Sequence, residues 1–106
     1  MRRDEPGLVF AALSDATRRD VLRRLASGSA TATELAAELP ITRQAVTKHL
    51  SALADAGLVE PSRQGREVRY QLTPEPLGDA VSWIADLDDT WGQRLAALQR
   101  HLRRER

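Results

Sequence analysis

Apolar residues recur at helical spacing through the first half of the chain. One set of positions predicts a short helix within residues 8–14. A longer helix is predicted in "SDATRRDVLRRLASG", where Ser14 or Asp15 is the N-cap and Gly28 ends the helix. The N-terminal part of the chain is therefore expected to be helical.

Two further helices are predicted so close together that only a tight turn can join them. Thr31 and Glu34 have the spacing of a capping box, in which each side chain accepts a hydrogen bond from the other residue's backbone N–H. Thr42 is the predicted N-cap of the next helix, and Gly57 stands where a left-handed residue would end it. Residues 31–57 therefore predict a helix-turn-helix, whose second helix typically enters the major groove of DNA.

After this unit the hydrophobic period changes from helical to alternating. Val68, Tyr70 and Leu72 share one face of a predicted strand, and a "QG" pair separates it from the strand before. Pro61 has no N–H for a ladder, so the first strand is expected at an edge of the sheet. Residues 58–72 thus predict a β-hairpin wing, with Arg63 and Arg66 near its tip and Arg69 on its outer face. The wing makes the unit a winged helix.

The last segment, residues 74–102, has apolar residues at alternating intervals of four and three, as in a helix that pairs with another helix. One position of this seam is occupied by Asp88, which either fixes the register of a helix pair or faces solvent where the helix bends. We expect one long helix here. The predicted fold class is mostly α, within α+β: about five helices, a two-stranded hairpin wing and a long C-terminal dimerisation helix.

The composition limits the function classes. The 106 residues are enough for a single domain, and no stretch is apolar enough to cross a membrane. The N-terminus is charged and lacks the apolar region of a signal peptide, so a cytoplasmic protein is expected. The absence of cysteine excludes disulfides, thiolate metal sites and cysteine nucleophiles. With two histidines and no glycine-rich phosphate loop, we expect neither an enzyme nor a cofactor.

The net charge is only +1, so a nucleic-acid partner has to be argued from where the charge lies. Residues 41–72 carry a small excess of basic residues, whereas residues 73–92 contain several acidic residues and no Lys or Arg. The basic excess thus falls on the predicted helix-turn-helix and wing. Four arginines of the second helix alternate with aspartates and are expected to form a solvated, ion-paired surface: Arg18, Arg19, Arg23 and Arg24.

Several motifs together resemble the ArsR/SmtB family of bacterial winged-helix repressors. "ALSDATRRDVLRRL" is similar to the start of the family's second helix, "ELAAELPITRQAVTKHLSALADAGLV" to its helix-turn-helix, and "GREVRYQL" to its wing. "WIADLDDTWGQRLAALQRHL" resembles the closing helix of one branch. The resemblance covers residues 8–102 and implies a homodimer, joined through its first and last helices, that binds inverted repeats in promoters. The chain departs from many members at Ala16, where proline is common, and at Pro40, where glycine is common.

Candidate DNA contacts lie on one polar face of the second helix of the helix-turn-helix and on the hairpin. Arg43 can bind guanine in a bidentate manner and Gln44 adenine, while Thr47 can reach a base or a phosphate. The alternatives are a solvated helix face and arginines that merely keep an edge hairpin soluble. His49 either packs half-buried, contacts a phosphate or reads a base. The expected contacts are Thr42, Arg43, Gln44, Thr47, Lys48, His49, Ser51, Arg63, Arg66 and Arg69.

Dimerisation is expected to use the helices at 8–14 and 74–102. Trp83 and Trp91, the only tryptophans, are expected in core or dimer packing, with an aromatic ligand site as the alternative. The expected interface residues are Leu8, Leu77, Val81, Ile84, Trp91, Leu95 and Leu98.

Metal sensing through the last helix is not expected. Family members that sense metals there place an aspartate and a histidine two residues apart, followed by two further ligands. Asp86 fits the first position, but Asp88, Gln99 and Leu102 occupy the others. Because zinc sites favour His and Cys ligands, the resemblance implies no metal site in this chain.

The chain is therefore predicted to be a single winged-helix domain over residues 1–106, a cytoplasmic, homodimeric transcription regulator that binds an inverted repeat in double-stranded DNA and represses transcription. The alternative is a winged-helix protein-interaction module without specific DNA binding. The sequence does not identify an effector that releases the protein from DNA.

Overall fold

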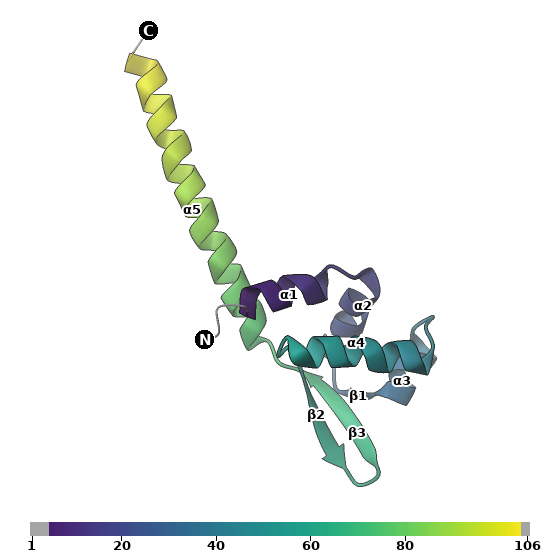
Figure 1. Cartoon of the computed structure of the whole chain (residues 1–106). Coiled ribbons are helices and arrows are strands. Elements are labelled where there is room, and N and C mark those ends of the chain that lie inside the picture. Colours follow the sequence, from purple (N-terminus) through teal and green to yellow (C-terminus); the bar gives the residue numbers. More distant parts are fainter. Residues whose placement is uncertain (1–4, 105–106) are drawn as a thin grey trace.

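The computed structural model describes residues 5–104, which fold into five α-helices and a small sheet (Figure 1). In chain order the elements are α1 (Glu5–Leu13), α2 (Ala16–Ala26), β1 (Ala30–Thr31), α3 (Ala32–Glu38), α4 (Arg43–Asp55), β2 (Val59–Gln64), β3 (Glu67–Leu72) and α5 (Glu75–Arg104). The predicted winged helix-turn-helix is confirmed, with α3 and α4 as the helix-turn-helix and β2 and β3 as the wing. Helix α1 begins earlier than predicted. None of the helices in the described range has the length and apolarity needed to cross a membrane.

The wing belongs to a three-stranded antiparallel sheet with the order β1-β3-β2. Strand β2 pairs with β3 from Val59↔Leu72 to Gln64↔Glu67. Pro61 lies in β2 at the sheet edge, as expected of a residue that cannot donate to a ladder. Strand β1 escapes prediction from the sequence because two residues are too few to show an alternating pattern.

Side-chain caps fix where three helices begin. Asp15 accepts a hydrogen bond from the backbone N–H three residues ahead at the start of α2 (3.0 Å), and Thr42 does the same for α4 (3.1 Å). At the start of α3, Thr31 and Glu34 form the predicted capping box. All three caps stand at predicted positions, because the short polar side chains that prefer helix N-termini are visible in the sequence itself.

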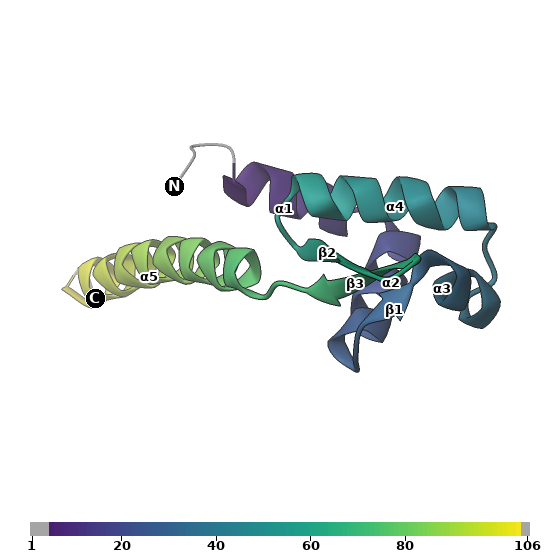
Figure 2. The ribbon, with the colours of Figure 1, turned by 90° about the horizontal axis from the view of Figure 1, so that it is seen from below.

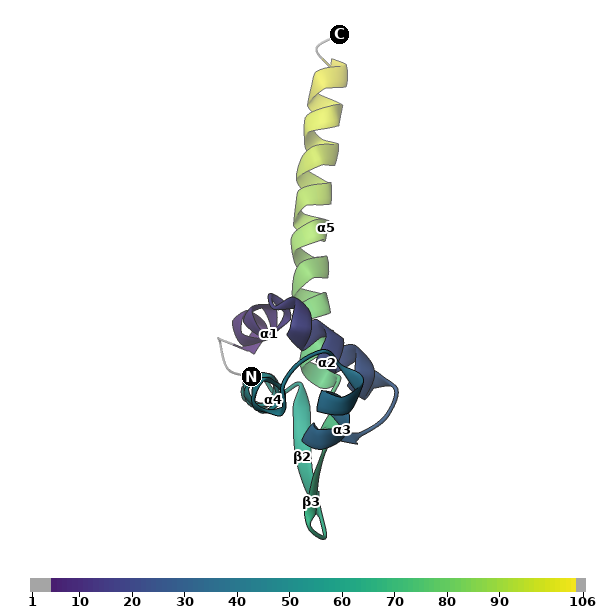
Figure 3. The same cartoon turned by 90° about the vertical axis from the view of Figure 1, so that its right-hand side faces the viewer.

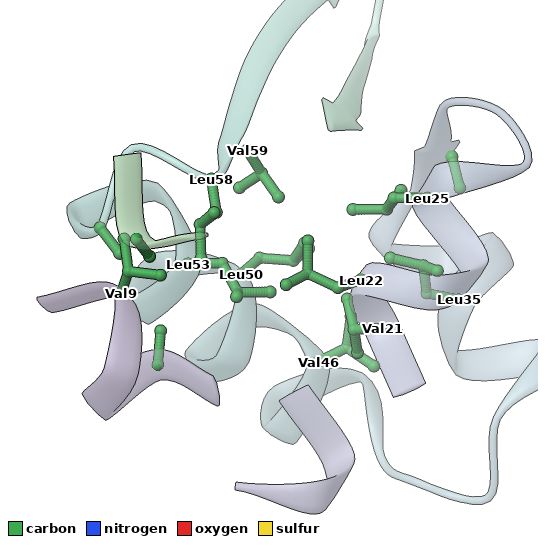
Figure 4. Packing of buried hydrophobic residues seen from close by; sticks show 14 residues of the cluster. Val9, Val21, Leu22, Leu25, Leu35, Val46, Leu50, Leu53, Leu58 and Val59 are labelled. Atoms are coloured by element: carbon green, nitrogen blue, oxygen red, sulfur yellow. The ribbon is translucent and has the colours of Figure 1, made fainter. Parts of the chain in front are cut away.

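The helices α1, α2, α3 and α4 and the base of the wing share one hydrophobic core (Figure 4). Its largest fully buried side chains are Leu35, Leu50, Leu53, Leu58, Val9, Val21 and Val46. Three of these, Val46, Leu50 and Leu53, form the inner face of α4. Burial of that face determines which residues of α4 point outward.

Gly57 ends α4 and turns the chain into the wing. Its φ of 75° lies in the left-handed region that glycine adopts without a steric penalty. The N–H of Gly57 donates to the carbonyl of Ala54 and the N–H of Leu58 to that of Leu53, both at 2.9 Å, which is a Schellman motif. Leu58 therefore enters the core directly after the helix, and the helix end sets where β2 begins.

Two arginines of α2 correct the expectation of a purely ion-paired surface. Arg18 Nη1 donates to the carbonyl oxygen of Ala11 at 3.1 Å, and Arg19 Nη1 donates to that of Leu13 at 2.6 Å. Cationic groups at a helix C-terminus satisfy carbonyls that have no helical partner and interact favourably with the helix dipole. These two side chains therefore cap α1, while the other two arginines of the set form ion pairs as expected.

Helix α5 is one uninterrupted helix of 30 residues that extends away from the rest of the molecule (Figures 1, 2 and 3). Its first turns are held in place, since Leu77 packs against the core and Ala80 is buried. The described chain measures 71 Å along its longest axis and has a radius of gyration of 19.4 Å, against about 13 Å for a compact domain of this length. The predicted long C-terminal helix is confirmed, and Asp88 lies within it.

Candidate nucleic-acid interface

The polar face of α4 points away from the core. Its exposed residues are Arg43, Gln44, Thr47, Lys48 and Ser51, and Thr42 is exposed at the N-cap. Within the described part of the chain, the side chains of Arg43, Gln44 and Lys48 make no hydrogen bond or ion pair. Their donors are therefore available to a partner molecule.

Two residues of this helix are less free. The hydroxyl of Thr47 donates to the carbonyl oxygen of Arg43 at 3.0 Å, so only its lone pairs remain for another group. His49 is half-buried and lies near Asp15, whose carboxyl pKa is held below its ordinary value mainly by the N–H of Arg18, with a smaller contribution from His49. This placement favours packing for His49 over an outward role.

The wing and the helix-turn-helix enclose a cleft of about 560 Å³. Arg43 and Thr47 line it from α4, and Arg66 lines it from the wing. Three residues that the sequence singled out, on two separate elements, are thus brought together around one cleft. The hairpin tip itself points away from the far end of α5 (Figures 1 and 3).

The cleft also contains two side chains that the sequence did not indicate as contacts. Thr33 lies in the first turn of α3 and is exposed, and Tyr70 of β3 is half-buried. The sequence placed Thr33 in the first turn of this helix, two residues after the predicted N-cap Thr31, but only the structure shows that this turn faces the wing. Tyr70 could not be found from the sequence either, because its alternating neighbours assign it to the apolar face of the strand.

The three wing arginines do not form one set. Arg63 and Arg66 are exposed at the tip of the hairpin, as predicted. Arg69 was predicted on the outer face of the wing, and this is wrong: its side chain is only 24% exposed. Its guanidinium turns toward α3, where Nη1 lies 2.8 Å from Oε1 of Glu34. The short strand β1, which pairs with β3 at this position, brings α3 close enough for that contact.

A second surface, the α5 apolar face, consists of exposed apolar side chains along the distal helix: Val81, Trp83, Ile84, Leu87, Trp91, Leu95, Leu98 and Leu102. Leu8 and Phe10 of α1 are also exposed, and Phe10 continues the α5 apolar face, since the rings of Phe10 and Trp83 are 5.6 Å apart in an edge-to-face arrangement. Leu77, which was expected in the same set, packs instead on the protein's own core. Trp83 and Leu87 lie beside the four-three seam of α5, and Phe10 contacts Trp83 from α1. Trp83 was expected in core or dimer packing, whereas Phe10 and Leu87 were not indicated by the sequence.

The acidic residues of α5 lie along the same exposed helix. Within residues 5–104 no three His, Cys, Asp or Glu side chains lie close enough together to hold a metal ion.

Comparison with known proteins agrees with this architecture. Residues 13–62 match a family described as a helix-turn-helix domain. The chain is 40% identical over 90 residues to the HTH-type transcriptional regulator Rv2034 of Mycobacterium tuberculosis (85% of this chain, 81% of the relative). It is 34% identical over 76 residues to the transcriptional repressor SdpR of Bacillus subtilis (72% of this chain, 84% of the relative).

Solved structures extend the match to the whole fold. An ArsR-like transcriptional regulator from Rhodococcus sp. RHA1 superposes with a TM-score of 0.85 at 42% identity and covers 91% of both chains. A homodimeric winged helix-turn-helix DNA-binding domain from Mycobacterium bovis, Mb0332, superposes with a TM-score of 0.66 at 26% identity (81% of this chain, 80% of that one). The chain belongs to the ArsR family of winged helix-turn-helix transcriptional regulators.

Proposed function

We propose that the protein is a homodimeric transcriptional repressor that binds an inverted repeat in promoter DNA through α4 and the wing. The observation that carries the proposal is the cleft in which the unpaired Arg43 of α4 faces Arg66 of the wing, with the exposed and unpaired Gln44 and Lys48 on the same face of α4. A helix that presents free donors beside a basic hairpin suits a DNA groove and its flanking phosphates. The proposal includes a cytoplasmic location, because a bacterial repressor would meet promoter DNA there.

The two elements have different roles in this proposal. Arg43, Gln44 and Lys48 reach base edges from the first turns of α4, where the recognition helix of such folds meets the major groove. Arg63 and Arg66 contact phosphates or the minor groove from the wing tip. Of the remaining predicted residues, the N-cap Thr42 and Thr47 and Ser51 of α4 are exposed on the same surface, whereas the half-buried His49 mainly packs.

Dimerisation is supported by the α5 apolar face. Side chains such as Val81, at 64% exposure, and Trp91, at 55%, form an apolar stripe whose area is far larger than that of an isolated apolar residue on a protein surface. A second copy of the chain offers the matching stripe, and the related Mb0332 domain is homodimeric. Two recognition helices related by such a dyad would read half-sites about 34 Å apart on one face of B-DNA.

Repression is supported by the similarity to SdpR, which is named a transcriptional repressor. We further propose that release from DNA does not depend on a metal. The chain has no cysteine, and Asp88, Gln99 and Leu102 are poor substitutes for the ligands of a metal site on this helix.

The test is DNA binding by matched arginine variants. The duplex is the one that the wild-type protein selects from a random library, and the comparison duplex is a scrambled version of it. Arg43→Ala is expected to weaken binding to the selected duplex by 1–3 kcal/mol, or about 5- to 150-fold, and to relax specificity at one base pair. Arg66→Ala is expected to weaken binding to both duplexes alike and to make the salt slope shallower by about 1.

Arg100→Ala is the matched control, because it removes the same charge from the exposed part of α5. It is expected to leave both affinities within a factor of about two, since surface substitutions away from a contact are worth about 0.5 kcal/mol or less. A wild-type protein that selects no sequence and binds every duplex equally would contradict the proposal. That result would favour the alternative of a winged-helix interaction module without specific DNA binding.

A further inference from the structure

Arg69 connects the wing to the helix-turn-helix through side chains rather than through the sheet. Three N–H groups of its guanidinium have partners: Nε donates to Oγ of Ser29 at 3.2 Å, Nη2 to the carbonyl oxygen of Ser29 at 3.0 Å, and Nη1 to Oε1 of Glu34 at 2.8 Å. We call Arg69, Ser29 and Glu34 the Arg69 clamp. Its members come from β3, from the turn before β1 and from α3, so the clamp spans three elements.

Glu34 has two tasks in this arrangement. The same Oε1 that accepts from Arg69 also lies 3.4 Å from the backbone N of Thr31, as part of the capping box that begins α3. The hydrogen bond from Arg69 is the main cause that lowers the pKa of the Glu34 carboxyl, and the Thr31 N–H adds to it. Arg69 is therefore attached to the group that fixes the start of the first helix of the helix-turn-helix.

The clamp matters because the backbone connection at this point is short. Strand β1 contributes only Ala30 and Thr31, paired with Tyr70 and Arg69 of β3. Within residues 5–104, no ladder beyond these two residue pairs joins the wing to another element, since β2 lies on the far side of β3. A multidentate guanidinium, with its planar arrangement of donors, fixes the orientation of β3 in a way that a two-residue ladder does not.

The position of β3 in turn sets the geometry of the cleft. Arg66 and Tyr70 line the cleft from the wing, while Arg43 and Thr47 line it from α4. A rotation of the wing about its base would change the distance between Arg66 and Arg43. It would therefore also change how far apart a phosphate contacted by Arg66 and a base contacted by Arg43 can lie. We propose that Arg69 is a positioning residue, which holds the wing at the distance from α4 that operator DNA requires and does not itself contact DNA.

This proposal rests on the proposed function, and the competing view is that Arg69 is a third phosphate contact of the wing. The two views predict different salt dependence. A phosphate contact adds to the number of counterions released, so its loss makes the salt slope shallower by about 1. Loss of a positioning residue weakens binding to the selected duplex while the slope stays as in the wild type.

The binding experiment compares Arg69→Gln, Glu34→Gln and the double variant on the selected duplex and on its scrambled version. Glu34→Gln is the matched variant, because glutamine keeps the capping box but removes the nearer of the two carboxylates paired with Arg69, the other being Glu67 at 3.6 Å. Each single variant is expected to weaken binding to the selected duplex by about fivefold, with the slope unchanged, and the double variant by no more than either single variant, because the two residues act as one unit. Arg66→Gln, which changes the slope, is the positive control.

Two results would overturn the proposal. A slope made shallower by about 1 in Arg69→Gln, with Glu34→Gln behaving like the wild type, would identify Arg69 as a phosphate contact. Wild-type affinity and slope in both single variants would show that the clamp positions nothing that binding needs.

A measurement without DNA separates failure of the clamp from failure of the proposed function. In the free protein, NMR titration should find the Glu34 pKa higher in Arg69→Gln than in the wild type, and backbone relaxation should find more motion at residues 63–68. Both changes are expected even if the protein selects no operator. An unchanged Glu34 pKa and an equally ordered wing would end the clamp proposal whatever the DNA experiments show.

Discussion

The winged body of the molecule (α1 to α4 and the three-stranded sheet) and the distal part of α5 contain the same kinds of apolar residues, but the body buries them and α5 exposes them. In the body, Leu50 and Leu53 are 1% and 0% exposed, whereas Leu95 and Leu98 on α5 are 55% and 54% exposed. Leucine burial is what stabilises a fold, and an isolated helix gains little of it. The body therefore contains a complete hydrophobic core, whereas the α5 apolar face is half of one, which a second chain would complete in the proposed dimer.

The sharpest way to test this contrast is to truncate the same residue type in both regions. Leu53→Ala leaves a cavity in the closed core and is expected to lower the free energy of unfolding by about 3 kcal/mol. Chemical denaturation followed by circular dichroism measures this. The loss should not depend on protein concentration when the body unfolds as its own unit; a loss below about 1 kcal/mol would mean that the core is loosely packed.

The corresponding change on α5 is Leu95→Ala. It is expected to raise the dimer dissociation constant about 30-fold, equivalent to about 2 kcal/mol for the two truncated side chains, while the body stays folded. Sedimentation velocity over a dilution series measures the constant. Gln93→Ala, an exposed polar residue on the same helix, is the control and should leave it unchanged. Equal dissociation constants for both variants would mean that the apolar face is not the interface.

One substitution is expected to have opposite signs in the two regions. Gly57→Ala forces a side chain into a left-handed conformation, and its Cβ would lie 3.4 Å from Cγ of Pro76, so it should destabilise the protein by about 1 kcal/mol. Gly92→Ala lies inside α5, where the added Cβ would meet nothing within 4 Å apart from its chain neighbours and the backbone of its own helix turns, so it should stabilise the helix by up to about 1 kcal/mol. Thermal unfolding of both variants measures the difference, and a shared sign would contradict it.

The smallest expected effect is acid sensitivity of the body. The pKa of Glu34 is lowered mainly by Arg69, and that of Asp15 mainly by the Arg18 N–H, so both carboxylates add stability above their unfolded pKa. That stability is lost as the pH falls through the lowered values, below about pH 4. Asp15→Asn keeps the cap without a charge, so its unfolding curve should depend less on pH in this range than that of the wild type. An identical pH dependence would assign the acid response to other groups.

Local signals made most of the body predictable. The N-caps at Asp15, Thr31 and Thr42 and the left-handed Gly57 act within a few residues of themselves, so the sequence shows them directly. The polar face of α4 follows equally from the spacing of its buried residues, because one helix period assigns both faces.

What could not be predicted depends on contacts between distant segments. Alternation places Arg69 opposite Tyr70 on its strand, but only the packing of α3 against β3 determines that this side is covered. The role of Arg18 in capping α1 is hidden for the same reason, because the two residues it joins to belong to a neighbouring helix. In both cases the sequence shows only an arginine in a charged stretch, which predicts an exposed side chain. Its hydrogen-bond acceptors come from segments that the sequence does not place beside it.

The placement of the two tryptophans gives the molecule an optical property of its own. Trp83 and Trp91 are the only indole groups, and both stand on the exposed half of α5, at 50% and 55% exposure. None lies in the winged body, so tryptophan emission reports mainly on α5 and on the contact of Trp83 with Phe10 of α1. Emission should move to shorter wavelength when a second chain shields these rings from water, which makes association readable on the unlabelled protein.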